Sequence, residues 1–291
     1  MNTLTEPSGS KARSFAEAAE ALNRDGAAVI RNVVPAYWIE RMRDAVQVEL
    51  GGGSPTGAEY GRVAGRFYGD FFLWLRNSVF RAFACEAPMP ALAAQLMKSK
   101  RVNLFYDQLF VKEPGSVERT PWHQDLPYWP VVGQQVVSLW IPFDRATPDN
   151  GVVTYIQGSH RWGRTFRPKA FDEANAGAFA GSSYEAIPDI DAEPNQYTFI
   201  NWSLEPGDVL AHLGLTIHGA PGNHTAGERR RALALRYTGD DARYDPRPGT
   251  FMGMEQVRRY IPPPGIEPGA RMGGPLFPEV WPDVRMAPDV A

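Results

Sequence analysis

The chain has 291 residues, a formal net charge of −3 and a single cysteine, Cys85. Its length suffices to bury a large core. Its small net charge and the lack of a basic run do not point to nucleic acid or an anionic membrane. One cysteine rules out an internal disulfide and disfavours a structural zinc site. No signal peptide and no apolar run of ~18 residues is present, so a cytoplasmic location is expected.

The N-terminal part of the chain predicts a helical layer. Ser14 and Glu17 have the spacing of a capping box, which indicates a helix to about Asn23. A short apolar strand follows at residues 27–30, and Pro35 begins a second helix. The apolar residues near one face of this second helix are Trp38, Ile39, Met42, Ala45 and Val46.

The next segments alternate between glycine-rich and apolar stretches. Residues 56–69 are rich in glycine and predict a loop. Residues 71–84 and 90–98 predict two further helices, and the first of them is strongly aromatic. We interpret residues 71–84 as a buried helix; the alternative is that one or two of its aromatic side chains line a substrate cavity.

From residue 102 onwards the pattern has the two-residue period of β-strands. The predicted strands are residues 102–112, 134–144, 151–156, 209–213, 215–218 and 230–237. Strands separated by Gly, Pro and Asp turns, with helices mainly in front of them, predict a mainly β protein with flanking α-helices. The expected architecture is an antiparallel double-stranded β-helix (a jelly roll, cupin-like) behind an N-terminal helical layer.

No domain boundary is visible, so residues 1–291 are expected to form one domain, with residues 1–13 disordered. Residues 161–199 are rich in Ala, Gly, Pro and Asp, and such a long segment inside a β-domain is either disordered or a lid over a pocket. Residues 245–291 carry three consecutive prolines and many glycines, and they are expected to form an irregular strap over the surface.

The stretch Trp122-His123-Gln124-Asp125 is the first candidate functional site. In an extended segment, side chains two residues apart leave the same face, so His123 and Asp125 can reach one metal ion while Gln124 points away. An imidazole and a carboxylate suit iron(II), and a second, distant histidine would complete the two-histidine, one-carboxylate set of non-haem iron oxygenases. The pair alone is common by chance, and a surface loop is the competing interpretation.

The candidate for the second histidine is His218, which is followed by Gly219 and Gly222. The glycines would let the backbone turn directly after the ligand, and Asn223 would hold that turn through backbone hydrogen bonds. His212 shares the strand parity of His218, but it lacks the following glycine turn and is interpreted as a hydrogen-bonded histidine of the barrel.

Three consecutive arginines, Arg229, Arg230 and Arg231, come shortly after His218 and open an apolar strand. A guanidinium is costly to bury unless it meets an anion, and its planar fork suits a carboxylate. The alternative is that these arginines decorate a solvated strand end.

Five motifs in this order resemble those of the phytanoyl-CoA dioxygenase family, which comprises iron(II)- and 2-oxoglutarate-dependent oxygenases on a double-stranded β-helix. The resemblance covers about residues 27–244. The motifs are Trp122-His123-Gln124-Asp125, Gly158-Ser159-His160, Pro206-Gly207-Asp208, His218-Gly219-Ala220 and Arg230-Arg231-Ala232.

The resemblance implies that His123, Asp125 and His218 ligate iron and that an arginine after His218 binds the distal carboxylate of 2-oxoglutarate. The usual gap in the family favours Arg229. The pattern of an arginine, a basic residue and an alanine favours Arg230, which we prefer because strand alternation places it on one face with two alanines.

The resemblance implies less about the supporting residues. Gln108 and Lys112 would help to hold the cosubstrate, although Lys112 at a solvated strand end is the alternative. Trp140 would form a wall of the iron site or be a core aromatic residue. Trp122 and Tyr128 would contact the substrate or simply pack. Two remaining histidines fall outside the site: His160 resembles a turn residue, and His224 lies in a loop.

The activity implied is a dioxygenase that uses Fe(II), 2-oxoglutarate and O2 to hydroxylate an unactivated C–H bond of a small, largely apolar molecule, with release of succinate and CO2. Asp125 argues against the halogenases of the family, whereas desaturation and ring formation stay open. A jelly-roll Mn or Zn isomerase without 2-oxoglutarate and a non-catalytic jelly-roll binding module are the alternatives. Neither has a use for a buried arginine beside the triad. The sequence does not indicate an oligomeric state.

Overall fold

A computed structural model describes residues 14–61, 64–169, 179 and 182–282; the disorder expected for residues 1–13 lies outside this range. Its α-helices are α1 (Phe15–Asp25), α2 (Ala36–Gly51), α3 (Ser78–Cys85), α4 (Met89–Met97) and α5 (Glu255–Tyr260). Its strands are β1 (Ala27–Ile30), β2 (Ala58–Glu59), β3 (Phe67–Phe71), β4 (Val102–Lys112), β5 (Thr120–His123), β6 (Val131–Val132), β7 (Val136–Pro142), β8 (Thr154–Ile156), β9 (Phe199–Ile200), β10 (Val209–Leu213), β11 (His218–Ala220), β12 (Arg230–Thr238), β13 (Arg243–Tyr244) and β14 (Glu279–Trp281).

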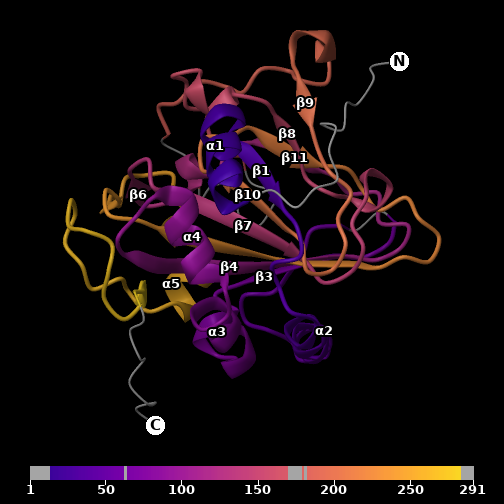
Figure 1. Cartoon of the computed structure of the whole chain (residues 1–291), viewed down its shortest axis with the longest axis horizontal. Helices are drawn as coiled ribbons and strands as arrows, with labels where there is room; N and C mark the ends of the chain where they lie inside the picture. Colours follow the sequence, from indigo (N-terminus) through magenta and orange to yellow (C-terminus); the bar gives the residue numbers. More distant parts are fainter. Residues whose placement is uncertain (1–13, 62–63, 170–178, 180–181, 283–291) are drawn as a thin grey trace.

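Two antiparallel sheets form the centre of the described part of the chain. The major sheet has the order β1-β10-β7-β12-β4-β3-β2, with β14 also paired to β4, and the minor sheet has the order β5-β11-β8-β9. In Figure 1, β8, β9 and β11 lie together near the top, whereas α2 and α3 lie at the bottom. The mainly β class with helices in front of the strands, expected from the sequence, is confirmed.

The major sheet separates two cores because its side chains alternate between its faces. On β7, Val137, Leu139 and Ile141 belong to the core that also contains the buried faces of α1, α2, α3 and α4. Trp140 belongs instead to the core between the two sheets, and Ala234 on β12 pairs with it across the strands. The even-numbered residues of β7 and β12 therefore face the minor sheet, and this alternation matches the prediction.

The helical layer follows the sequence closely. Ser14 and Glu17 form the predicted capping box, with the Ser14 hydroxyl accepting from the Glu17 amide at 3.2 Å. Helix α1 ends at Gly26, whose φ of 83° is left-handed and suits glycine. The buried residues of α2 are the five predicted, Trp38, Ile39, Met42, Ala45 and Val46.

Residues 56–85 differ most from the prediction. The expected loop contains β2 and β3, which extend the major sheet beyond β4. The expected helix over 71–84 is divided: Phe72 has a left-handed φ of 57°, and α3 begins only after Asn77, whose side chain accepts from the amides of Val79 and Phe80. A continuous apolar run does not distinguish a buried strand from a buried helix, so hydrophobic periodicity could not predict this break.

The strand predicted over residues 215–218 begins only at His218. The preceding segment is a turn, in which the Thr216 amide donates to Leu213 O and the Thr216 hydroxyl donates to Gly26 O at 2.7 Å. An apolar alternation of four residues is too short to exclude such a turn.

The C-terminal segment is not an irregular strap throughout. Its described part includes α5, and β14 pairs with β4. Phe277 is fully buried and Leu276 is 2% exposed, so both belong to the main core. The prolines and glycines concealed this contribution because they dominate the composition of the segment. Residues 283–291 lie outside the described residues.

Residues 161–199 are described in part. Phe166 and Ile190 are buried with Ile156 and Ile217, behind the strand that carries His218. The described residues of this insertion are therefore packed against the minor sheet, while residues 170–178, 180 and 181 lie outside the described range. Its role as a lid stays a prediction, as does the single-domain organisation. None of the described helices combines the length and apolarity that crossing a bilayer requires.

Asp107 on β4 generates a prediction about stability. Burial, reinforced by the charge of Asp70, raises the pKa of the Asp107 carboxyl to about 7. The folded chain therefore binds this proton more tightly than the unfolded chain, where an aspartate titrates near 3.9. This stabilisation is complete below about pH 4 and is lost as the pH rises towards 7.

The free energy of unfolding of Asp107→Asn minus that of wild type should increase by about 2–3 kcal/mol when the pH is raised from 5 to 8. Urea unfolding at the two pH values measures this gain. The control variant is Asp149→Asn, at an exposed carboxylate, and the gain of Asp107→Asn should exceed any change in this control. A constant difference for Asp107→Asn would contradict the assignment.

Candidate metal centre

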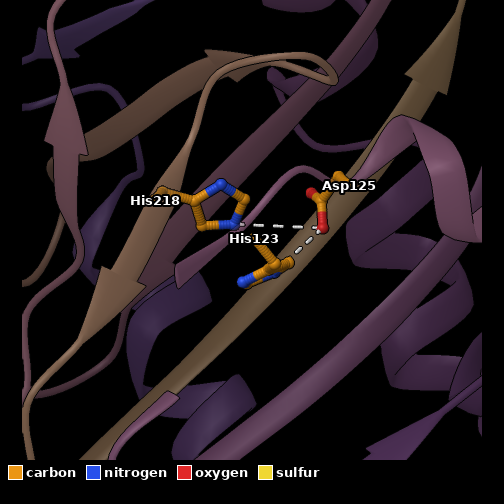
Figure 2. Close-up of side chains that lie close together, drawn as sticks. All are labelled: His123, Asp125 and His218. Atoms are coloured by element: carbon orange, nitrogen blue, oxygen red, sulfur yellow. Dashed lines mark ion pairs between the residues drawn. The ribbon is translucent and has the colours of Figure 1, made fainter. Parts of the chain in front are cut away.

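The structure brings together three side chains that the sequence separates, His123, Asp125 and His218. Asp125 Oδ1 lies 3.5 Å from His123 Nε2 and 3.9 Å from His218 Nε2. Figure 2 shows both histidine rings turned toward this carboxylate. One ligand atom from each residue lies within 4.8 Å of the other two, which is close enough for all three to hold one metal ion. The predicted convergence is therefore present.

Strand pairing places the two histidines, and a turn places the carboxylate. His218 on β11 lies directly opposite His123 on β5 in the antiparallel register. Strand β5 ends at His123, and Asp125 has helical dihedral angles (φ −74°, ψ −45°) before a short 3-10 helix, Leu126–Tyr128. Contrary to the prediction from the sequence, His123 and Asp125 therefore do not lie along one extended strand, because the chain bends after His123 and brings the carboxylate back to it.

Backbone carbonyls fix the tautomer of both histidines. His123 Nδ1 lies 2.8 Å from Pro121 O, and His218 Nδ1 lies 2.9 Å from Thr216 O. A carbonyl oxygen only accepts, so each Nδ1 carries the proton and each Nε2 carries the lone pair that a metal needs. This arrangement prepares both rings to ligate through Nε2.

The second oxygen of Asp125 is held by the major sheet. Asp125 Oδ2 accepts from the Ser138 hydroxyl at 3.1 Å and lies 3.1 Å from His212 Nε2. His212 Nδ1 in turn lies 3.3 Å from the Tyr155 hydroxyl. Oδ1 is consequently left to face the two ligand histidines.

His212 thus contacts the candidate site, although the sequence led us to place it outside. It is a hydrogen-bonded barrel histidine, as interpreted, but its partner is the candidate metal ligand itself. Strand register brings His212 to the site. His212 pairs with Ser138 across β10 and β7, and Ser138 pairs with Arg236 across β7 and β12. The sequence alone does not contain this register.

The electrostatics favour deprotonated ligands. Burial alone would raise the pKa of Asp125, but Arg236 and the surrounding histidines hold it well below its ordinary value. Burial lowers the pKa of His218 well below its usual range, and neighbouring His123 and His212 lower it further. A neutral imidazole and a charged carboxylate are the forms that bind a metal, so the site fits a divalent cation of the iron(II) type.

Gln124 and Ser159 hold the ligand-bearing segments in place. As predicted, Gln124 points away from the site: its side-chain amide donates to Leu215 O at 3.0 Å and to Arg164 O at 3.1 Å. The Ser159 hydroxyl accepts from the Ile217 amide at 2.8 Å, directly before His218. His160 Nε2 lies 3.0 Å from Asn23 O and is outside the site.

Close approach of neighbouring backbone, and not a left-handed backbone conformation, favours glycine at two positions after His218. A Cβ at Gly219 would lie 3.0 Å from Thr120 O, and one at Gly222 would lie 2.6 Å from Ser116 O. Asn223 holds the following turn as predicted, since its side chain donates to Lys112 O and Glu228 O.

The three arginines have separate environments. Arg229 binds Glu113 at 2.8 Å and Arg231 binds Asp144 at 2.7 Å, so each has a carboxylate partner outside the cavity. Arg230 is 2% exposed, lines the cavity and stacks 5.5 Å from the Trp140 ring. Burial lowers its pKa to about 10. The solvated-strand alternative is therefore wrong for Arg230.

The supporting residues also separate. Gln108, Trp140 and Tyr128 line the same cavity as the triad. Lys112 is fully buried, and its ammonium group donates to Glu118 O and Pro221 O, so it is not at a solvated strand end. Trp122 lies among the residues packed behind the minor sheet, where its indole N–H donates to Asp191 at 3.0 Å.

The cavity measures about 270 Å³ and extends from Arg230 past the triad to an aromatic end. Phe72, Tyr106 and Phe251 form that end, with ring centroids 5.2–6.0 Å apart. Phe72 confirms that the aromatic stretch 71–84 contributes to the cavity wall. The volume suits small molecules.

Comparison with known proteins agrees with this geometry. Residues 22–232 match the family phytanoyl-CoA dioxygenase (PhyH). A probable phytanoyl-CoA dioxygenase of Caenorhabditis elegans is 27% identical over 164 residues, 54% of this chain and 50% of that protein. Peroxisomal phytanoyl-CoA dioxygenase of Rattus norvegicus is 25% identical over 61% of this chain and 51% of that protein. The chain thus spans about half the length of these curated relatives.

Solved structures share the fold at lower identity. SnoN, a non-haem α-ketoglutarate-dependent epimerase from nogalamycin biosynthesis, is 20% identical with a TM-score of 0.71, over 91% of this chain and 98% of that one. EctD from S. alaskensis is also 20% identical, with a TM-score of 0.64 over 81% of each chain. These likenesses confirm the double-stranded β-helix.

The contacts of His212 predict a role in metal affinity. Replacement of His212 by Gln removes the ring that holds Asp125 Oδ2, and groups of this kind typically change metal affinity by about 10- to 100-fold. We expect Mn(II) titration calorimetry to show that loss, with His224→Gln in the exposed loop as control. Equal affinity in the two variants would exclude His212 from the site.

Proposed function

Because the chain belongs to the phytanoyl-CoA dioxygenase family, we propose that it is an iron(II)- and 2-oxoglutarate-dependent dioxygenase that hydroxylates a C–H bond of a small organic molecule. The observation that carries the proposal is the shared cavity: two imidazoles, one carboxylate and a buried guanidinium all face it. Because the chain spans only about half the length of the curated relatives, we do not carry their substrates over to it.

His123, Asp125 and His218 would hold the iron through Nε2, Oδ1 and Nε2. Iron(II) bound there with 2-oxoglutarate and O2 supplies the oxidation of the substrate, with succinate and CO2 as the other products. All three residues line the cavity, so an ion that they held would be accessible to ligands from it. Ser138 and His212 keep Asp125 oriented, and the aromatic walls limit the access of water.

Arg230 would bind the distal carboxylate of 2-oxoglutarate. It is the one member of the arginine run that faces the cavity, its Nε has no hydrogen-bond partner among the described residues, and Nη1 reaches Phe110 O at 3.2 Å. A buried guanidinium in this state favours an incoming carboxylate. Gln108 lies across from Ala234 on the neighbouring strand and would line the same cosubstrate site.

An isomerase without 2-oxoglutarate or a binding module would leave Arg230 without a role. Trp140 and Tyr128 line the cavity and would form part of its wall near the iron, whereas Trp122 is assigned to packing. The cytoplasmic location stays a prediction from the sequence.

Removal of the carboxylate tests the metal assignment. We expect Asp125→Ala to abolish succinate formation from 2-oxoglutarate, because two imidazoles alone neither neutralise nor orient the ion. The control is Asp149→Ala, at an exposed carboxylate, which should form succinate at the wild-type rate. Substantial turnover by Asp125→Ala would remove this residue from the site.

The neighbouring arginines offer a matched pair for the cosubstrate. We expect Arg230→Met to raise the KM for 2-oxoglutarate by about tenfold or more, the amount expected for a charged hydrogen-bonded pair. Arg229→Met should change it little, since Arg229 binds Glu113 outside the cavity. The opposite ranking in succinate assays would transfer the role to Arg229.

A further inference from the structure

A second arginine, Arg236, enters the same cavity from the other end of β12. Arg230 and Arg236 both lie on the even-numbered face of this strand, which looks toward the minor sheet. Arg236 is 4% exposed, so its guanidinium is buried as thoroughly as that of Arg230. Only Arg230 would bind 2-oxoglutarate in the proposed function, so the buried charge of Arg236 has no ligand there.

Hydrogen bonding to the protein does not satisfy Arg236. Its Nε has no hydrogen-bond partner among the described residues, and Nη1 reaches Ala234 O only at 3.5 Å. The carboxylate beside it is Asp125, whose Oδ2 lies 3.9 Å from Nε, too far for a hydrogen bond. Asp125 Oδ2 already accepts hydrogen bonds from the Ser138 hydroxyl and from His212 Nε2. Arg236 therefore retains donor capacity inside the cavity.

Aromatic rings hold the guanidinium in place without neutralising it. The centre of the guanidinium lies 4.5 Å from the Tyr106 ring and 5.6 Å from the Trp129 ring. The Trp129 indole N–H donates to the Tyr106 hydroxyl at 2.8 Å, which fixes the two rings relative to each other. Such faces stabilise a cation, but they leave its N–H groups available for an anion.

The charges of the proposed complex do not balance without a further anion. The buried ionic side chains that line the described cavity are Asp125, Arg230 and Arg236. Glu118 also lines it, but this carboxylate is only partly buried and belongs to the segment beside Lys112, at the Arg230 end of β12. In the proposed function, the two positive charges of iron(II) would be compensated by Asp125 and by one carboxylate of 2-oxoglutarate, and the distal carboxylate would compensate Arg230. Arg236 then remains a buried cation at the aromatic end, a state that is costly unless an anion joins it.

We propose that Arg236 binds a carboxylate of the organic substrate, so that the substrate class is a small carboxylic acid with an apolar body. The carboxylate would meet the guanidinium, and the apolar body would lie against Phe72, Tyr106 and Phe251. The inference rests on the proposed function and refines the expected largely apolar substrate by one anionic group. Arg236 is on this account a specificity-determining residue.

The test uses wild-type protein loaded with iron(II) and saturating 2-oxoglutarate without oxygen, so that no turnover occurs. Two probes of nearly equal shape, phenylacetate and phenylacetamide, are titrated by calorimetry. The variants are Arg236→Met, the conservative Arg236→Lys, and Arg231→Met as control. Arg231 lies on the same strand, but it faces away from the cavity and binds Asp144.

Wild-type protein and Arg231→Met should bind phenylacetate about tenfold or more tightly than phenylacetamide. Arg236→Met should lose that preference, and Arg236→Lys should keep part of it because the charge remains without the fork. The proposal is overturned if wild type binds phenylacetate no better than the amide, or if Arg236→Met keeps the preference. Thermal unfolding of each variant verifies that it is folded.

The visible absorption band of iron(II) with 2-oxoglutarate distinguishes failure of the proposed function from failure of the role of Arg236. If the band fails to form in wild-type protein, the proposed function fails and this inference with it. If the band forms and the probe preference is absent, only the role of Arg236 fails. A large loss of 2-oxoglutarate affinity in Arg236→Met would assign this arginine to the cosubstrate and would likewise overturn the proposal.

Discussion

The carboxylate of Asp125 is the interaction on which the rest of the site depends, because its two oxygens join the two sheets. Oδ2 is held from the major sheet by Ser138 and His212, and Oδ1 faces the ligand histidines of the minor sheet. The distance between the sheets, the register of β10 on β7 and the orientation of the metal ligands are thus set together. A shift of one residue in that register would turn His212 to the opposite face of the sheet and remove its contact with Asp125.

The cavity-facing side chains of β12 change in character along the strand. Arg230 lies at one end of β12, small alanines lie in the middle, and Arg236 lies at the other end among aromatic rings. The small residues leave room for ligands between the sheets, while the guanidinium at each end fits a separate anion. In the proposed function, the same strand would position the cosubstrate at one end and the substrate at the other.

The sequence predicts what short-range patterns determine. The capping box of α1, the buried face of α2, the strand 102–112 and the alternation of β7 all follow from local spacing. The convergence of His123, Asp125 and His218 is expected from the ordered motifs of the family. The remainder depends on contacts between distant segments. The division of residues 71–84, the pairing of β14 with β4, and the approach of His212 and Arg236 to Asp125 are set by register, which no local period encodes.

The most direct test of the central claim is a crystal structure of the protein grown without oxygen with iron(II) and 2-oxoglutarate. The account predicts one metal ion bound by Nε2 of His123, Nε2 of His218 and a carboxylate oxygen of Asp125, with the far carboxylate of the cosubstrate on Arg230. An ion bound elsewhere, or held by His212 in place of one of these residues, would contradict it.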